Sequence, residues 1–169
     1  MRIVAGGTLG RTQNRGMTMI TPPPSGTYGA RVPSSGFRRF GSRMMSGIYR
    51  LFGGRGVSNL LLLTTTGART GEPRTTPLRR FDDGDGRWLI VASAQGSAKQ
   101  PAWLHNLVAH PDGAWIEIGH DRWKVRPEML APTEWEAAWQ RVVAEAPEFG
   151  KYTTTTDREI PLVRLIRER

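Results

Sequence analysis

Two arginines, Arg69 and Arg74, are the residues whose type and spacing most directly suggest chemistry. They lie in the stretch LLLLTTTGARTGEPRTTPL at residues 60–78, in and just after a turn with glycines at both ends. A guanidinium binds phosphate or carboxylate through paired hydrogen bonds, so two arginines beside one turn suit an anionic ligand. The spacing alone favours a plainer interpretation, in which both are ordinary solvated arginines on a surface turn.

Other residue types that carry chemistry are sparse. The chain has no cysteine, which excludes disulfides, thiolate nucleophiles and cysteine-bound metals. Its histidines, His105, His110 and His120, do not have a metal-binding spacing such as HExxH, so no metal site is expected. No Walker loop, GxGxxG turn or Ser-His-acid arrangement stands out. Such a chain either binds a ligand without reacting or uses a cofactor that brings its own chemistry.

The elements that must position these residues are mostly short strands. Apolar and Thr-rich runs separated by Gly- and Asp-rich turns predict about six strands joined mainly by hairpins, as in an antiparallel sheet. The runs are residues 60–66, 73–80, 87–93, 114–118, 122–127 and 160–166. A short helix is predicted after Pro101 and a longer one after Thr133. We expect a mainly β (α+β) fold, a six-stranded antiparallel barrel with flanking helices, because closure hides the sheet edges.

The net charge of +9 resides in the first third of the chain. Residues 1–55 contain nine arginines and no Lys, Asp or Glu; the whole chain has 24 basic and 15 acidic residues, so residues 56–169 carry equal numbers of each. Residues 1–35 are rich in Pro, Gly and Arg, and we expect a disordered leader because they cannot bury enough apolar area. Residues 36–55 predict a basic amphipathic helix, and residues 56–169 the barrel domain.

The basic helix has two interpretations. Phe37, Phe40, Met44, Ile48 and Leu51 recur at helical spacing, with arginines largely on other faces. Such a helix suits the interface of an anionic membrane, and it equally suits packing against its own domain. No apolar run approaches the length of a membrane span. We expect a cytoplasmic protein, with peripheral contact at the inner face of the cell membrane through residues 36–52 under the first interpretation. A nucleic-acid partner is not expected, because the barrel is neutral overall.

Several separated motifs resemble one protein family. TTTGARTGEPRTTPL is followed in order by VASAQG, PAWLHNL, HPDGAWIEIG, FGKY and TDREIPLVRL, over about residues 58–167. Together they resemble the deazaflavin (coenzyme F420)-dependent nitroreductase family of actinobacteria. The resemblance implies a split β-barrel that binds coenzyme F420, a reduced 8-hydroxy-5-deazaflavin, in a groove beside the barrel.

The resemblance also implies which residues bind the cofactor. They are Arg69, Arg74, Thr75, Thr76, Pro77, Ser93, Ala94, Gln95, Gly96, Lys99, Ala102 and Trp103. The two arginines would hold the anionic tail, the Thr75–Pro77 run would line the groove, and the later segments would lie near the phosphate or the ring. Many members carry Lys where this chain has Ala94, and Lys99 is the candidate to replace that cation. Trp103 has a competing interpretation as a core aromatic.

Two aromatic residues, Phe149 and Tyr152, match the positions that close the substrate side in this family. Tyr152 is implied as the catalytic residue, because a phenol can orient an acceptor or donate a proton to it; packing against the cofactor is the alternative. Members more often have Tyr at the position of Phe149, so the resemblance leaves open whether nitroimidazole prodrugs are reduced.

The implied function is hydride transfer from reduced deazaflavin to a planar apolar acceptor, either a quinone such as menaquinone or a nitroaromatic compound. The protein would need only to hold donor and acceptor in contact and to shield them from water. Two alternatives remain open: an FMN-dependent reductase, and a non-catalytic protein that binds deazaflavin or lipid. The oligomeric state also stays open.

Overall fold

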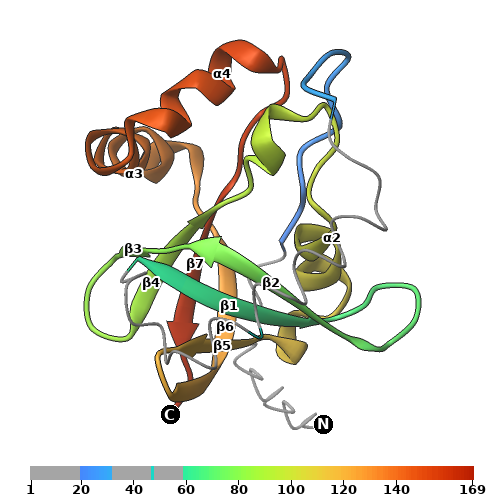
Figure 1. The fold of residues 1–169 in the computed structure, drawn as a ribbon, viewed down its shortest axis with the longest axis vertical. Coiled ribbons are helices and arrows are strands. Elements are labelled where there is room, and N and C mark those ends of the chain that lie inside the picture. Colours follow the sequence, from blue (N-terminus) through green and yellow to red (C-terminus); the bar gives the residue numbers. More distant parts are fainter. Residues whose placement is uncertain (1–19, 32–46, 48–58) are drawn as a thin grey trace, which may run out of the picture.

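The computed structural model describes residues 20–31, 47 and 59–169 (Figure 1). Its centre is a sheet with the strand order β2-β1-β5-β6-β7-β4-β3, in which every pair is antiparallel. The strands are β1 (Leu60–Thr66), β2 (Pro73–Arg79), β3 (Phe81–Asp82), β4 (Arg87–Val91), β5 (Trp115–Ile118), β6 (Asp121–Met129) and β7 (Leu162–Arg167). The two edge strands, β2 and β3, are separated in the chain by Arg80 alone. The sheet therefore curls so that its two edges come together at Arg80, as in a split β-barrel.

The mainly β, antiparallel barrel predicted from the sequence is confirmed, but it has seven strands where we predicted six. The difference lies at Arg80, where β2, the strand paired with β1, has ended and β3 begins at the next residue. The Arg80 amide donates to the Asn59 carbonyl oxygen at 2.8 Å, and the next residues, Phe81 and Asp82, pair with Leu89 and Trp88 of β4. A strand of two residues has no periodicity of its own, so the sequence could not show it as a separate element.

Helices cover the barrel at different places. They are α2 (Ala102–Ala109), α3 (Pro132–Glu145) and α4 (Tyr152–Thr155), and short 3-10 turns form at Ala94–Gly96, Pro111–Gly113 and Pro147–Lys151. In Figure 1, α3 and α4 lie together at one end of the barrel, while α2 lies beside the β1–β2 hairpin. The loop between β4 and α2, residues 92–101, runs between these two groups of helices.

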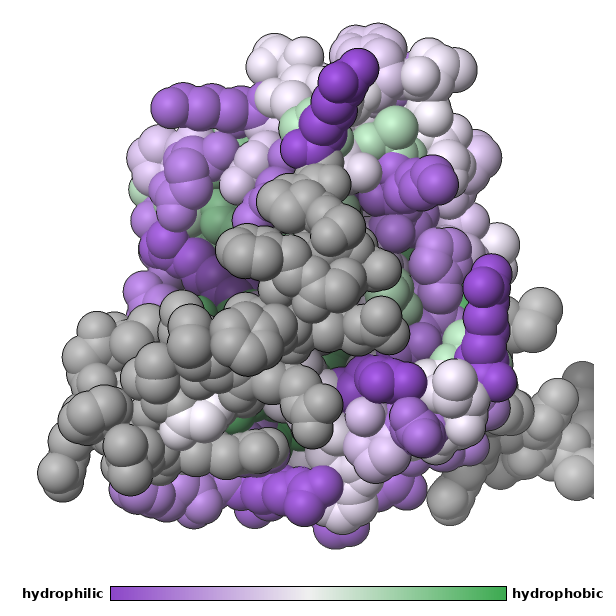
Figure 2. All heavy atoms as spheres, turned by 45° about the vertical axis from the view of Figure 1, so that its right-hand side comes forward, coloured by the Kyte–Doolittle hydropathy of each residue, from purple (hydrophilic) through white to green (hydrophobic). Residues whose placement is uncertain are grey.

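The core has two clusters, one under each group of helices. The first joins Leu61 and Leu63 of β1 to Leu104 and Leu107 of α2, all fully buried. The second joins Leu89 and Leu162 of the sheet to Trp139 and Val142 of α3. Each fully buried leucine contributes about 1.5 to 3 kcal/mol. On the part of the face in Figure 2 that is not drawn in grey, hydrophilic side chains predominate and hydrophobic ones are visible only in small areas.

Part of the predicted leader has defined contacts. The sequence analysis expects residues 1–35 to be disordered, yet residues 20–31 lie against the loop after β4, and Ile20 is buried in the first core cluster. The rest of that leader lies outside the described residues, as does the predicted helix 36–55 apart from Gly47. Among the described residues, no helix is long and apolar enough to cross a membrane.

A charged residue, Asp83, ties α3 to the sheet. Its carboxylate accepts hydrogen bonds from Arg141 of α3 at 2.8 Å and from Arg164 of β7 at 2.5 Å. Arg164 also bonds Glu134 at the start of α3, at 3.2 Å. Burial raises the pKa of Asp83, but the hydrogen bonds and charges of Arg141 and Arg164 together lower it by more. The net pKa of Asp83 therefore lies below its ordinary value.

Replacing Asp83 with Asn should therefore destabilise the protein in a pH-dependent way. At pH 7 we expect the free energy of unfolding to fall by about 1 to 3 kcal/mol, because charged hydrogen bonds are lost at a shielded site. Because the pKa of Asp83 is depressed in the folded state, its carboxylate stabilises the fold above the unfolded-state pKa of about 3.9. This stabilisation is lost as the pH falls through the folded-state pKa. Urea denaturation should thus show the difference shrinking below about pH 4. A difference independent of pH would contradict this account. The control is Asp121→Asn, which removes an exposed carboxylate.

Candidate functional site

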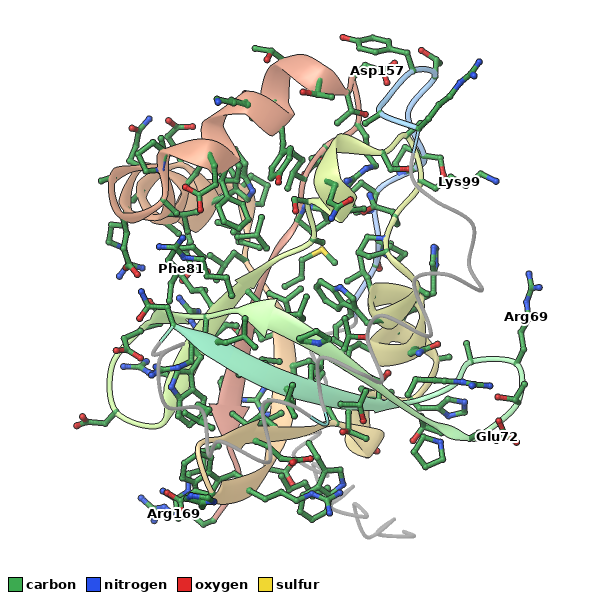
Figure 3. All side chains as sticks on the ribbon, viewed as in Figure 1. Arg69, Glu72, Phe81, Lys99, Asp157 and Arg169 are labelled. Carbon is green, nitrogen blue, oxygen red and sulfur yellow. The ribbon has the colours of Figure 1, made fainter. Side chains whose placement is uncertain are left out.

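The turn that carries Arg69 is held in shape by its own backbone. The Gly67 amide donates to the Glu72 carbonyl oxygen, and the Gly71 amide to the Gly67 carbonyl oxygen, both at 2.8 Å. Gly71 has φ +68°, a left-handed conformation that glycine adopts without steric cost. Arg69 is exposed and projects outward from the tip of the β1–β2 hairpin (Figure 3). Within the described part of the chain it has no ion pair, so its charge is available to a ligand.

Arg74, unlike Arg69, has an ion-pair partner. Its guanidinium lies 2.9 Å from the Glu72 carboxylate and 3.4 Å from the Thr70 hydroxyl. Both members of the ion pair are well exposed, and exposed pairs of this kind are worth little. An anionic ligand can therefore compete with Glu72 for Arg74. The structure places both predicted arginines at the same hairpin end, with Arg69 as the freer cation.

The groove-lining residues of β2 do not share one face. Thr75 is paired with Thr64 and Thr76 with Leu63, and paired residues point to the same side of a sheet. Leu63 belongs to the core, so Thr76 points inward. Thr75 and Pro77 point to the other side, where the Thr75 and Thr64 hydroxyls lie 2.9 Å apart. Only Thr75 and Pro77 can thus line the same surface.

A buried amide, Asn106 of α2, fixes the hairpin end. Its side-chain oxygen accepts from the Ala68 amide at 3.0 Å, and its Nδ2 donates to the Thr65 hydroxyl at 2.9 Å. The sequence analysis missed Asn106. The available signal was a polar residue among Trp103, Leu104 and Leu107 in the apolar part of the predicted helix, because a buried amide there needs partners.

The loop after β4 has an unusual backbone. Ala94 and Gln95 have φ values of +45° and +56°, and Gly96 follows with φ +75°. Left-handed conformations are uncommon for residues with a side chain, and consecutive ones occur where the surrounding structure enforces them. A Cβ on Gly96 would lie 2.8 Å from the Thr155 methyl carbon and 3.4 Å from the Tyr152 ring. Glycine is thus required, and the loop lies directly against α4.

A hollow of about 370 Å³ lies where this loop meets α2. It is lined by Ser25, Ala94, Ser97, Lys99, Gln100, Ala102 and His105. Three of these, Ala94, Lys99 and Ala102, are predicted cofactor-binding residues. Lys99 is exposed, has no ion pair among the described residues and points outward (Figure 3). A larger hollow of about 520 Å³ lies at the C-terminal end around Arg87 and Arg167, and it contains none of the predicted residues.

The predicted aromatic residues fall into two groups. Trp103 is only 5% exposed and lies in the first core cluster, which matches its interpretation as a core aromatic. Phe149 and Tyr152 are half-buried and meet edge to face, with ring centroids 5.6 Å apart. Phe149 also packs against Phe81 at 5.7 Å. The Phe149–Tyr152 pair therefore packs against the second core cluster, with Tyr152 beside Gly96 of the loop.

A second residue that the sequence analysis missed is Arg158, which is 4% exposed. Its guanidinium donates to the Ser93 carbonyl oxygen at 2.7 Å, to the Ser97 carbonyl oxygen at 3.0 Å and to Oε1 of Gln100 at 2.6 Å. Burial lowers its pKa, but an arginine still keeps its charge at neutral pH. No signal in TTTTDREIPL distinguishes it from a solvated arginine, because its partners are about 60 residues away.

Replacing Asn106 with Leu should loosen the hairpin end. Leucine keeps much of the volume but leaves the Ala68 amide and the Thr65 hydroxyl without their partner, which costs about 1 to 3 kcal/mol of unfolding free energy. Urea denaturation measures that loss, and amide hydrogen exchange at Ala68 should become faster. In Asn106→Asp an acceptor remains for the Ala68 amide, so its exchange should stay slow. Equal exchange in the two variants would show that Asn106 does not anchor the turn.

Comparisons with known proteins agree with the resemblance predicted from the motifs. Residues 41–166 match the model of a family described as F420H(2)-dependent quinone reductase. An F420H(2)-dependent quinone reductase of Mycobacterium tuberculosis is 43% identical over 115 residues, which are 66% of this chain and 76% of that protein. A solved structure of an F420-H2 dependent reductase has 33% identity and a TM-score of 0.57, covering 63% of this chain and 93% of its own.

A more distant structure shows the fold alone. A protein of unknown function from Agrobacterium tumefaciens has 18% identity and a TM-score of 0.53, and the match covers 82% of this chain and 58% of that one. The family model, by contrast, spans most of the chain and includes every predicted site residue. The chain belongs to the F420H(2)-dependent quinone reductase family.

Proposed function

We propose that this protein transfers hydride from reduced coenzyme F420 to a quinone, with the cofactor held beside α2 between the 370 Å³ hollow and the tip of the β1–β2 hairpin. The observation that carries the proposal is the family match over residues 41–166. The hollow supports it, because Ala94 and Ala102, from two separate motifs of the resemblance, line one space together with Lys99.

The charges fit an anionic cofactor. Arg69 and Lys99 are exposed and have no carboxylate partner within the described residues, and Figure 3 shows both projecting toward the same side of the molecule. Arg74 is offset only by an exposed pair with Glu72. A tail that carries phosphate and carboxylate groups can bind these cations through charge-assisted hydrogen bonds. We infer that Lys99 supplies the cation that Ala94 lacks.

The acceptor side would be formed by Phe149 and Tyr152. When bound, reduced coenzyme F420 supplies a hydride from its deazaflavin ring, so the protein needs no metal and no nucleophile. The aromatic pair lies beside the loop at Gly96 and offers apolar surface to a planar quinone. Tyr152 would orient the acceptor or donate the proton that a reduced quinone oxygen takes up. With Phe at position 149, the chain lacks a second hydroxyl at this place.

Cofactor titration tests the proposal directly. We expect the purified protein to bind coenzyme F420 more tightly than FMN and to reduce menadione with the reduced cofactor. In Arg69→Glu, F420 should bind about tenfold more weakly, the factor that corresponds to one lost charged hydrogen bond, and the KM for F420 should rise more than kcat falls. Fluorescence titration and steady-state kinetics measure the two effects.

The matched control is Arg169→Glu, which reverses an exposed arginine at the opposite end of the molecule (Figure 3). It changes net charge by the same amount and should leave the affinity unchanged. Tighter binding of FMN would overturn the choice of cofactor. Binding of F420 without menadione turnover would instead indicate a non-catalytic binding protein.

We further propose that residues 36–52 bring the protein to an anionic membrane, where apolar quinones reside. The support is the sequence pattern alone, with arginines alongside a helical row of Phe, Met, Ile and Leu. Replacing Arg38, Arg39, Arg43 and Arg50 with Gln should abolish sedimentation with anionic liposomes. Menaquinone reduction in such liposomes should fall, and reduction of dissolved menadione should not. Unchanged sedimentation of the variant would refute the membrane role.

A further inference from the structure

Residues 20–31, which we call the N-terminal strap, run along the loop after β4 (Figure 1). Two backbone hydrogen bonds join them: the Gly26 amide donates to the Ala98 carbonyl oxygen and the Ala30 amide to the Gly96 carbonyl oxygen, both at 2.8 Å. Ile20, at the start of the strap, is buried in the first core cluster. The strap is thus attached at both of its ends.

The approach of strap and loop is close enough to require glycine. A Cβ on Gly29 would lie 2.2 Å from the Ala98 nitrogen and 2.7 Å from the Gly96 oxygen. A Cβ on Gly26 would lie 2.3 Å from an Asp157 carboxylate oxygen and 3.0 Å from the Arg158 nitrogen. At Gly29 these contacts are to backbone atoms of the loop, so they cannot be relieved by moving a flexible side chain. At Gly26 the nearest atom belongs to the Asp157 side chain, so that contact is with the segment before β7 and not with the loop. Gly29 is therefore the position at which the strap fits the loop closely.

Asp157 holds the strap from the other side. Its carboxylate accepts hydrogen bonds from the Thr27 amide at 2.9 Å, from the Thr27 hydroxyl at 2.5 Å and from the Tyr28 amide at 3.2 Å. The neighbouring Thr156 hydroxyl donates to the Tyr28 carbonyl oxygen at 2.9 Å. The hydrogen bonds from Thr27 lower the pKa of Asp157, so the acceptor stays charged at neutral pH.

The next residue, Arg158, holds the loop instead. It bonds the carbonyl oxygens of Ser93 and Ser97 and the side chain of Gln100. Nε2 of Gln100 in turn donates to the Pro23 carbonyl oxygen of the strap at 3.3 Å. Two adjacent residues therefore fasten two segments that are far apart in sequence. The loop, with its left-handed residues Ala94 and Gln95, is thus bonded both by Arg158 and by the strap.

We propose that the N-terminal strap is a wall of the cofactor site and that Asp157 is the positioning residue that keeps it in place. Ser25 of the strap lines the 370 Å³ hollow together with Lys99, Ala102 and His105. A molecule in this hollow would touch the strap on one side and α2 on the other. The identity of that molecule rests on the proposed function; the attachment of the strap does not.

Asp157→Ala and Gly29→Val release the strap by independent means, the first by removing the acceptor of three donor groups and the second by adding a side chain where none fits. In both variants we expect faster amide hydrogen exchange at Thr27 and Tyr28 and an affinity for coenzyme F420 about tenfold lower, as for one lost polar contact. In Asp157→Ala the urea midpoint should stay near that of the unmodified protein, because Asp157 is exposed. Asp121→Ala removes an exposed carboxylate elsewhere and serves as the matched control.

The outcomes separate the inference from the function on which it rests. If the unmodified protein binds F420 and both variants bind it equally well despite a released strap, the strap is not a wall of the site. If exchange at Thr27 and Tyr28 does not change in Asp157→Ala, the role of Asp157 is refuted. If the unmodified protein does not bind F420 at all, the proposed function is refuted, and with it the role of the strap as a wall of the cofactor site.

Discussion

The closure of the sheet at Arg80 is the constraint on which the rest of the structure depends. β2 pairs with β1 at one edge and β3 pairs with β4 at the other, although one residue separates them in the chain. A single bend therefore brings the two edges together at Arg80. The same residue connects the β1–β2 hairpin, whose turn carries Arg69, to the β3–β4 hairpin, after which the loop begins.

Between these two segments, α2 acts as the spacer. Its apolar residues, Leu104 and Leu107, are buried against β1, and Asn106 reaches the hairpin end. On its exposed side, Ala102 and His105 line the hollow with Lys99. The helix thus fixes the cations at the hairpin relative to the loop. A barrel that is neutral overall can in this way present positive charge at one place, which matters more to a small anionic ligand than the net charge does.

Local patterns were enough to predict much of this arrangement. The Leu and Thr run of β1, the glycines around Arg69 and the helix after Pro101 were all visible in sequence, because period and turn chemistry are local. The parts that could not be predicted depend on distant partners. β3 is a strand only because β4 lies beside it, and Arg158 is buried only because the loop folds over it. Residues 20–31 look disordered by composition, yet their glycines fit a surface that exists only after folding.

The bonds around the loop explain how a chain with few catalytic groups can still hold a precise site. Arg158 binds two backbone carbonyl oxygens of the loop, whose positions depend on the path of the chain, and one loop side chain, that of Gln100. A buried guanidinium with several acceptors is costly to leave unpaired, so it opposes any loop shape that would remove one of them. Asp157 does the same for amides of the strap. These bonds therefore hold the backbone of the loop and the strap in one shape.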